Sequence, residues 1–283
     1  MNLEVQFFQA GYCTHPEAIV VEGGQWKNAI FPSLFALLKH PSAGLILFDT
    51  GYSGRFFQET RSFPFRFYRI ITPVYFKEEE SAVSQLQQQE ITPEAVNFII
   101  VSHFHADHIG GLKDFPQAKF FCFQSAYEAV KLQRGIAAVK AGFLPGLLPL
   151  DFEERAIFVE KQAPTALPPE YAPFEWGFDI LGDGSILAVE LPGHVIGQLG
   201  IFFTDRDNQT YFLIADACWL SRAYQELVTP HTLANLIFAN RQAYVDTLHK
   251  IHKLYQLNPG IKIIPTHCQD TWKSLQILNK FPQ

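Results

Sequence analysis

The chain has few cysteines, no cluster of basic residues and no long hydrophobic run, and each shortage excludes a class of protein. Its four cysteines (Cys13, Cys122, Cys218 and Cys268) lack the spacing of a metal site or a disulfide framework, which predicts a reducing compartment. With a net charge of −6 and no lysine or arginine cluster, the chain offers nucleic acid no electrostatic footprint. The longest apolar runs are only as long as strands, which argues against a transmembrane segment.

The amino terminus also lacks a positive stretch followed by an apolar core, so no signal peptide is expected and the prediction is a cytoplasmic protein. No repeat or low-complexity linker divides the 283 residues, and a chain of this length buries a large core as one domain, 1–283. The apolar pattern predicts strands near 3–9, 17–22, 44–49, 97–102, 118–123, 186–191, 198–204, 210–215 and 261–265, and helices near 80–90, 124–133 and 231–256, the last with Thr229 as its N-cap.

Four metal-binding side chains occur within six residues, in the pattern His-X-His-X-Asp-His from His103 to His108. They follow an apolar, β-branched run at residues 98–101, so the cluster lies where a predicted strand ends. Alternate residues of an extended segment point the same way, so His103 and His105 can bind one ion together. Asp107 and His108 come after the turn and can serve an adjacent position. Imidazole with carboxylate suits zinc best, with iron or manganese as alternatives, and the absence of cysteine argues against a structural zinc site.

Further along the chain, single metal-binding residues again follow short apolar runs. Asp49 begins an Asp-Thr-Gly sequence after residues 45–48, and His194, Asp216 and His267 each end a comparable run. With the histidine cluster, and in this order, these motifs resemble the metallo-β-lactamase superfamily over residues 4–267. The resemblance implies an α/β fold, the four-layer αββα sandwich. It also implies two divalent metal ions, with His103, His105 and His194 binding the first, Asp107, His108 and His267 the second, Asp216 bridging, and Asp49 orienting a ligand imidazole.

Many β-lactamases of the superfamily carry cysteine where this chain has Asp216, so the resemblance favours the broader dinuclear hydrolases. Two such ions lower the pKa of a bridging water towards about 7, and Asp107 or Asp216 is expected to pass the proton to the leaving group. The chain length and the spacing from His194 to Asp216 resemble N-acyl homoserine lactonases. Those enzymes carry tyrosine three residues after the bridging aspartate, where this chain has Trp219. We therefore predict hydrolysis of a lactone or related ester with an apolar group, with Trp219 and Phe104 binding the substrate.

Three alternatives stay open: a phosphodiesterase of the same fold, a thioesterase of the same fold, or a non-catalytic protein stabilised by metal.

Two segments depart from a minimal core and are predicted to form the substrate pocket, near residues 54–78 and 134–180. The first interleaves phenylalanine and tyrosine with arginine between Arg55 and Phe76. Its pattern fits an entrance wall that contacts an acyl chain or a membrane surface, and equally a buried accessory element or the contact of a homodimer.

Overall fold

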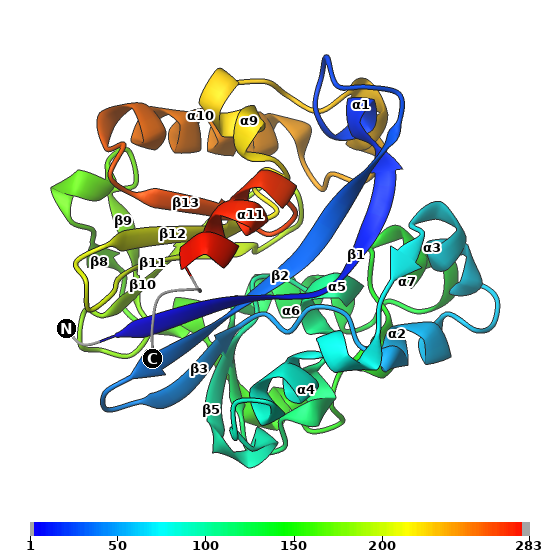
Figure 1. Ribbon diagram of the computed structural model, residues 1–283, viewed down its shortest axis with the longest axis horizontal. Helices are drawn as coiled ribbons and strands as arrows, with labels where there is room; N and C mark the ends of the chain where they lie inside the picture. The colour runs from blue at the N-terminus through cyan, green and yellow to red at the C-terminus, as the bar shows by residue number, and fades with distance from the viewer. Residues whose placement is uncertain (1–2, 279–283) are drawn as a thin grey trace.

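Two β-sheets face each other in the computed structural model, which describes residues 3–278 (Figure 1). The first sheet has the strand order β4-β1-β2-β3-β5-β6-β7 and the second β13-β12-β11-β10-β9-β8. The strands of the first sheet are β1 (Glu4–Pro16), β2 (Asn28–His40), β3 (Gly44–Phe48), β4 (Val74–Tyr75), β5 (Val96–Ile100), β6 (Lys119–Cys122) and β7 (Ala156–Phe158). Those of the second are β8 (Thr165–Ala166), β9 (Trp176–Asp179), β10 (Ile186–Glu190), β11 (Leu199–Thr204), β12 (Thr210–Ala215) and β13 (Lys262–Pro265).

Helices cover the outer faces of both sheets, which completes the αββα order (Figure 1). The amphipathic helix α10 packs Tyr244, Leu248 and Ile251 against the second sheet, and the inner faces of the two sheets share one continuous core. The helices are α1 (Glu17–Val20), α2 (Gly54–Glu59), α3 (Arg66–Ile71), α4 (Ala82–Gln87), α5 (Ala106–Ile109), α6 (Gln124–Val130), α7 (Gly135–Lys140), α8 (Phe152–Arg155), α9 (Ser221–Glu226), α10 (Arg241–Leu257) and α11 (Gln269–Leu278). None of the helices within residues 3–278 is long and apolar enough to cross a bilayer.

Parallel pairing brings the ends of the functional strands to one edge of the sandwich. Strands β3, β5, β6 and β7 run parallel in the first sheet, and β12 and β13 run parallel in the second. The carboxyl ends of parallel strands open at the same edge, so the loops after β3 and β5 lie together, as do those after β12 and β13. The predicted ligands all follow strand ends at this edge.

Two of the predicted elements are wrong, and several elements were not predicted, the long strand β2 among them. Residues 17–20 form the helix α1 instead of a strand, because an extended β1 ends at Pro16 and the chain turns there. The helix predicted over 231–256 is a 3-10 turn at Thr232–Leu236 followed by α10, and Asn240 is the N-cap in place of Thr229, since its side chain accepts from Ala243 N. Strand β2 was not predicted: its residues from Phe31 to Leu38 are all buried, so the chain shows no alternation of polar and apolar residues there.

Candidate metal centre

The loop after β5 carries the first four candidate ligands. His105 is the N-cap of α5, so Asp107 and His108 lie in the first turn of a short helix while His103 precedes it. Backbone bonds hold the loop in place: Thr50 N donates to the carbonyl of His108 at 2.8 Å, and Ala106 N to that of Gly142 at 3.1 Å. A β-carbon at Gly142 would lie 2.4 Å from Cδ2 of His105, so only glycine allows α7 to end this close to the imidazole.

Three further candidates approach from the second sheet. His194 follows β10, Asp216 follows β12, and His267 follows β13. β12 ends at Ala215 in the left-handed region, with φ of 47°, a conformation that costs an alanine about 1–2 kcal/mol and turns the chain at Asp216. The strained backbone lies beside a cluster of potential ligands, which is where proteins commonly retain such strain.

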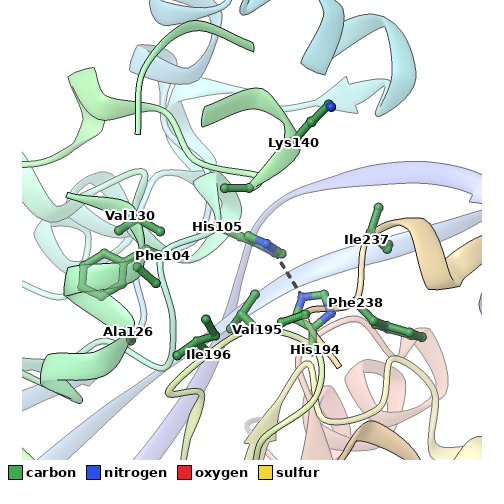
Figure 2. A pocket seen from close by; sticks show the side chains of 13 residues that line it. Phe104, His105, Ala126, Val130, Lys140, His194, Val195, Ile196, Ile237 and Phe238 are labelled. Atoms are coloured by element: carbon green, nitrogen blue, oxygen red, sulfur yellow. Dashed lines mark hydrogen bonds between the residues drawn. The ribbon is translucent and has the colours of Figure 1, made fainter. Parts of the chain in front are cut away.

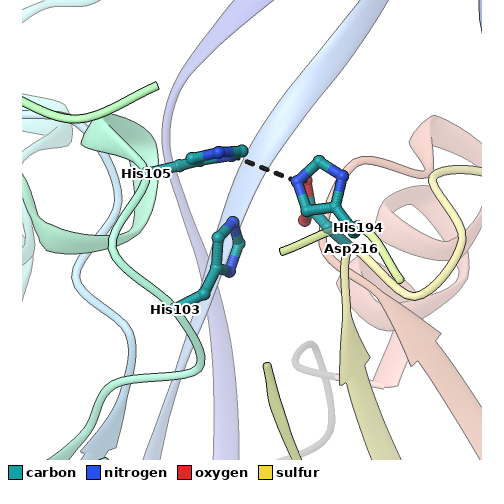
Figure 3. Close-up of side chains that lie close together, drawn as sticks. All are labelled: His103, His105, His194 and Asp216. Atoms are coloured by element: carbon teal, nitrogen blue, oxygen red, sulfur yellow. Dashed lines mark hydrogen bonds and ion pairs between the residues drawn. The ribbon is translucent and has the colours of Figure 1, made fainter. Parts of the chain in front are cut away.

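The seven predicted ligands come together as two adjoining groups. One group holds His103, His105, His194 and Asp216, and the other Asp107, His108 and His267, with the ligand atoms in each lying within 4.8 Å of one another. Figure 3 shows His103 and His105 facing His194 and Asp216 from opposite sides of the first group. Nε2 of His194 lies 3.1 Å from Nδ1 of His105. The grouping matches the ligand sets that the family resemblance implied.

The two oxygens of Asp216 face the two groups. Oδ1 lies 3.2 Å from Nε2 of His108 and 3.2 Å from Nε2 of His267. Oδ2 lies 3.4 Å from Nε2 of His194. A carboxylate has lone pairs on both oxygens, so this side chain is placed to serve both groups at once.

The donor atoms fit divalent metal ions. Nε2 of His103, Nε2 of His108 and Oδ1 of Asp216 are buried without a hydrogen bond, although such atoms normally have a partner. Each lies in one of the two groups or between them. Imidazole nitrogen and carboxylate oxygen are the ligands of catalytic zinc and of related transition metals.

A carboxylate and a backbone carbonyl behind the candidate ligands orient two imidazoles. Oδ2 of Asp49 lies 2.7 Å from Nδ1 of His108, and the same carboxylate accepts from Ser102 N at 2.8 Å and Ser102 Oγ at 2.7 Å. Asp49 thus stands where the resemblance implied. For His267, Nδ1 lies 2.7 Å from the carbonyl of Pro32 on β2. The sequence analysis missed Ser102 and Pro32; only the hydroxyl next to His103 offered a clue to the first.

Burial and neighbouring charges shift the pKa values of the candidate ligands in different directions. Burial lowers the pKa of His103 well below the usual value, with help from the imidazole of His108, and burial lowers the pKa of His194 to about 3. Burial acts to lower the pKa of His108 as well, but the carboxylates of Asp49 and Asp216 outweigh it and raise that pKa. Burial acts to raise the pKa of Asp216, but the imidazoles facing it hold that pKa well below its usual range. The carboxylate is therefore ionised.

Trp219 contacts a ligand instead of the open pocket. Its side chain is 8% exposed, and Nε1 donates to Oδ2 of Asp216 at 3.0 Å. The indole stacks on Phe238, with ring centroids 5.4 Å apart, and meets His194 edge-on at 5.6 Å. Trp219, three residues after Asp216, thus holds this carboxylate through the hydrogen bond that its indole N–H donates.

An apolar pocket of about 220 Å³ opens beside the first group of ligands (Figure 2). His105 and His194 form its polar side, and Phe104 is part of the wall, as the sequence-based assignment requires. The predicted insertion 134–180 contributes Lys140 and Ala141 from the end of α7, whereas no residue of 54–78 is among the lining residues. The remaining lining residues are Ala126, Ala129, Val130, Val195, Ile196, Ile237, Phe238 and Ala239, of which Val195 and Ile196 directly follow His194 in the sequence.

A sandwich of two sheets with buried imidazoles and carboxylates at one edge defines a metallo-hydrolase. The chain belongs to the metallo-beta-lactamase superfamily, whose profile matches residues 31–213. The family and the αββα fold predicted from the motifs are therefore confirmed.

Similar proteins include lactonases. The N-acyl homoserine lactonase AttM of Azorhizobium caulinodans is 26% identical over 263 residues, which cover 91% of this chain and 90% of AttM. A solved N-acyl homoserine lactone hydrolase, with the product N-hexanoyl-L-homoserine bound at its catalytic metal center, has a TM-score of 0.72 at 19% identity and covers 97% of both chains. AidC, a dizinc quorum-quenching lactonase, has a TM-score of 0.62 at 15% identity over 94% of this chain and 88% of its own. The two structures share the fold.

Proposed function

We propose that this protein is a dinuclear metal-dependent hydrolase that opens a lactone or a related ester with an apolar group. The observation that carries the proposal is Asp216, whose two oxygens face two separate groups of imidazoles, 3.2 Å from His108 and His267 and 3.4 Å from His194. One carboxylate shared between two donor sets is the arrangement that a pair of ions requires. We propose zinc because of the imidazole-rich donors, with iron and manganese as alternatives.

Two divalent ions held by the seven candidate ligands would supply a water of lowered pKa as nucleophile and would polarise the carbonyl of the substrate. The chain's own residues then divide the remaining tasks. Asp216 faces three imidazoles and accepts from Trp219, so both of its oxygens are directed at neighbouring groups. Among the described residues, Asp107 forms an ion pair with His267 alone, at 3.3 Å, and is the freer carboxylate. We assign to Asp107 the transfer of a proton to the leaving oxygen of the opened ester.

The pocket favours an ester that carries an apolar group. Its wall consists mainly of aliphatic and aromatic side chains, with Phe104 and Phe238 beside the ligands His105 and His194. Burial of each methylene group of a substrate there contributes about 0.8 kcal/mol. A bound acyl chain would also exclude water from the carbonyl that reacts. The lactonase relatives, named for substrates that combine an acyl chain with a lactone, support this substrate class.

Trp219 acts in this proposal by holding Asp216, and it meets the substrate only through Phe238. An indole donates a hydrogen bond but does not exchange its proton, whereas a phenol does both. Polarisation of the lactone carbonyl in this protein therefore depends more on the bound ions than it does in a lactonase that has tyrosine at this position. We expect a slower lactonase with the same preference for an apolar group.

The test combines elemental analysis with a substrate panel on one preparation made without chelator. The proposal expects close to two transition-metal ions per chain and turnover of acyl lactones that rises with acyl length. Thioesters and phosphodiesters in the same panel distinguish the alternative hydrolases. One ion or fewer after incubation with zinc or manganese overturns the dinuclear assignment. Tight binding of these compounds without turnover overturns the enzymatic one and supports a metal-stabilised binding protein.

A further inference from the structure

Helices α3 and α7, with the turns before them, expose a group of bulky apolar side chains. Their inward side chains Phe65 and Tyr68 pack on the core, as expected for a covering helix. The outward side chains have no such cover. We call this group the α3–α7 face; it comprises Phe63, Phe67, Ile70, Ile71, Leu132 and Ile136, exposed by 68%, 48%, 62%, 64%, 81% and 56%.

The two helices form one surface although about 65 residues separate them in the sequence. The rings of Phe63 and Phe67 meet edge-on with centroids 5.4 Å apart. A β-carbon at Gly135, the first residue of α7, would lie 4.0 Å from Cγ of Pro64. Figure 1 shows α3 and α7 side by side, away from α10 and the second sheet. Apolar side chains gathered in this way commonly mark a binding surface.

The same segments carry positive charge only. Residues 60–75 and 129–142 contain no aspartate or glutamate, in a chain whose net charge is −6. Glu59 precedes the first segment and Glu128 the second, and Glu78 follows the first segment. Arg69 lies over the ring of Phe57 and Lys131 over that of Tyr127. Among residues 3–278, none of the cations of these segments forms an ion pair with a carboxylate; they are Arg61, Arg66, Arg69, Lys131, Arg134 and Lys140.

We propose that the α3–α7 face docks on an anionic lipid surface. Its phenylalanine and isoleucine side chains would enter the boundary between headgroups and acyl chains, and its arginines and lysines would meet the phosphates. Charge decides between this occupant and a second copy of the chain. Two copies joined through this face would bring the same unpaired cations together, whereas an anionic bilayer neutralises them.

Docking in this way would bring the mouth of the pocket to the lipid. Lys140 ends α7, and Lys140 and Ala141 both line the apolar pocket beside His105. A compound with an acyl chain would then reach the pocket from the bilayer, where it accumulates, as well as from water. The docking itself is independent of the proposed hydrolysis, because it concerns a face that contains none of the metal ligands.

Vesicle co-sedimentation of the metal-loaded protein tests the proposal. Vesicles of phosphatidylcholine alone are compared with vesicles that also contain phosphatidylglycerol, at low and at high salt. We expect binding to the anionic vesicles only, weakened by salt. Each cation near such a surface contributes about five-fold in affinity, so Arg66→Glu, a change of two charges, is expected to weaken binding about thirty-fold. Ile70→Ser is expected to weaken it roughly ten-fold through lost apolar burial.

Two variants on the far side of the molecule serve as matched controls. Lys250→Glu makes the same change of charge on α10, and Leu257→Ser removes an exposed apolar side chain at the end of that helix. Both are expected to bind like the parent chain. Absence of binding to anionic vesicles, or equal losses in the α10 variants, overturns the proposal. The proposal is also overturned if the chain does not bind vesicles and instead forms a concentration-dependent dimer that Ile70→Ser abolishes.

Discussion

Replacing Asp49 by asparagine separates the charge of this side chain from its shape. Asp49 lies at the end of β3 with φ of 59°, and asparagine adopts this left-handed conformation readily, so the backbone is not disturbed. The carboxylate is fully buried and accepts from Ser102 N and Ser102 Oγ while it faces Nδ1 of His108. An amide of the same shape turns one acceptor into a donor that points at these groups.

The structure sets the size of the effect. Each hydrogen bond to a charged acceptor contributes about 1.5–3 kcal/mol, and at least one is lost while its buried donor stays unpaired. We expect Asp49→Asn to lower the free energy of unfolding by about 3–5 kcal/mol. His108 also loses the partner that orients it, which weakens metal binding by roughly 10–100-fold. The loss concerns the group formed by Asp107, His108 and His267.

Denaturant unfolding and metal titration of the two purified proteins measure these effects. Asp205→Asn is the matched control, because its buried carboxylate accepts from the backbone of Asp207 and Gln209 far from the metal centre. The control is expected to lose stability and keep its affinity for metal. The argument about His108 is refuted if Asp49→Asn binds both ions as tightly as the parent chain, or if the two variants differ only in stability.

Other variants test neighbouring parts of the site. Asp216→Ala is expected to lower the occupancy of both ions and abolish hydrolysis, whereas His267→Ala mainly empties one; equal losses of one ion, by elemental analysis, would contradict the bridging assignment. Trp219→Tyr is expected to raise kcat for acyl lactones because it restores a phenol, and unchanged kinetics on every lactone would argue against a lactonase. Gly142→Ala is expected to lower the free energy of unfolding by more than about 2 kcal/mol and to reduce metal uptake, because the new methyl group pushes on the imidazole of His105. Gly184→Ala is the control: its φ is similar but its surroundings are open, so it shows the backbone cost of about 1–2 kcal/mol alone. Equal results for the two variants would contradict the steric argument.

Local sequence was sufficient to select the candidate metal ligands and to predict the strands that precede them. His103, His105 and Asp107 follow a β-branched run, and such a cluster at a strand end has few explanations other than a metal. Strand β2 escaped prediction because its eight consecutive buried residues reflect packing on both faces and not a local preference. The short helix α1 escaped because its residues favour a strand locally, and only the turn at Pro16 ends the extended chain.

The sequence by itself determined the family, the types of the candidate ligands and their order along the chain, since these depend on residue identity and spacing. Only the tertiary structure decided how the ligands face one another, because His194, Asp216 and His267 reach the first sheet's loop by packing of the two sheets. It also decided that Trp219 holds Asp216 instead of lining the pocket. The α3–α7 face exists for the same reason: two segments distant in the sequence become one basic, apolar surface only when the helices pack side by side, and no local pattern records that contact.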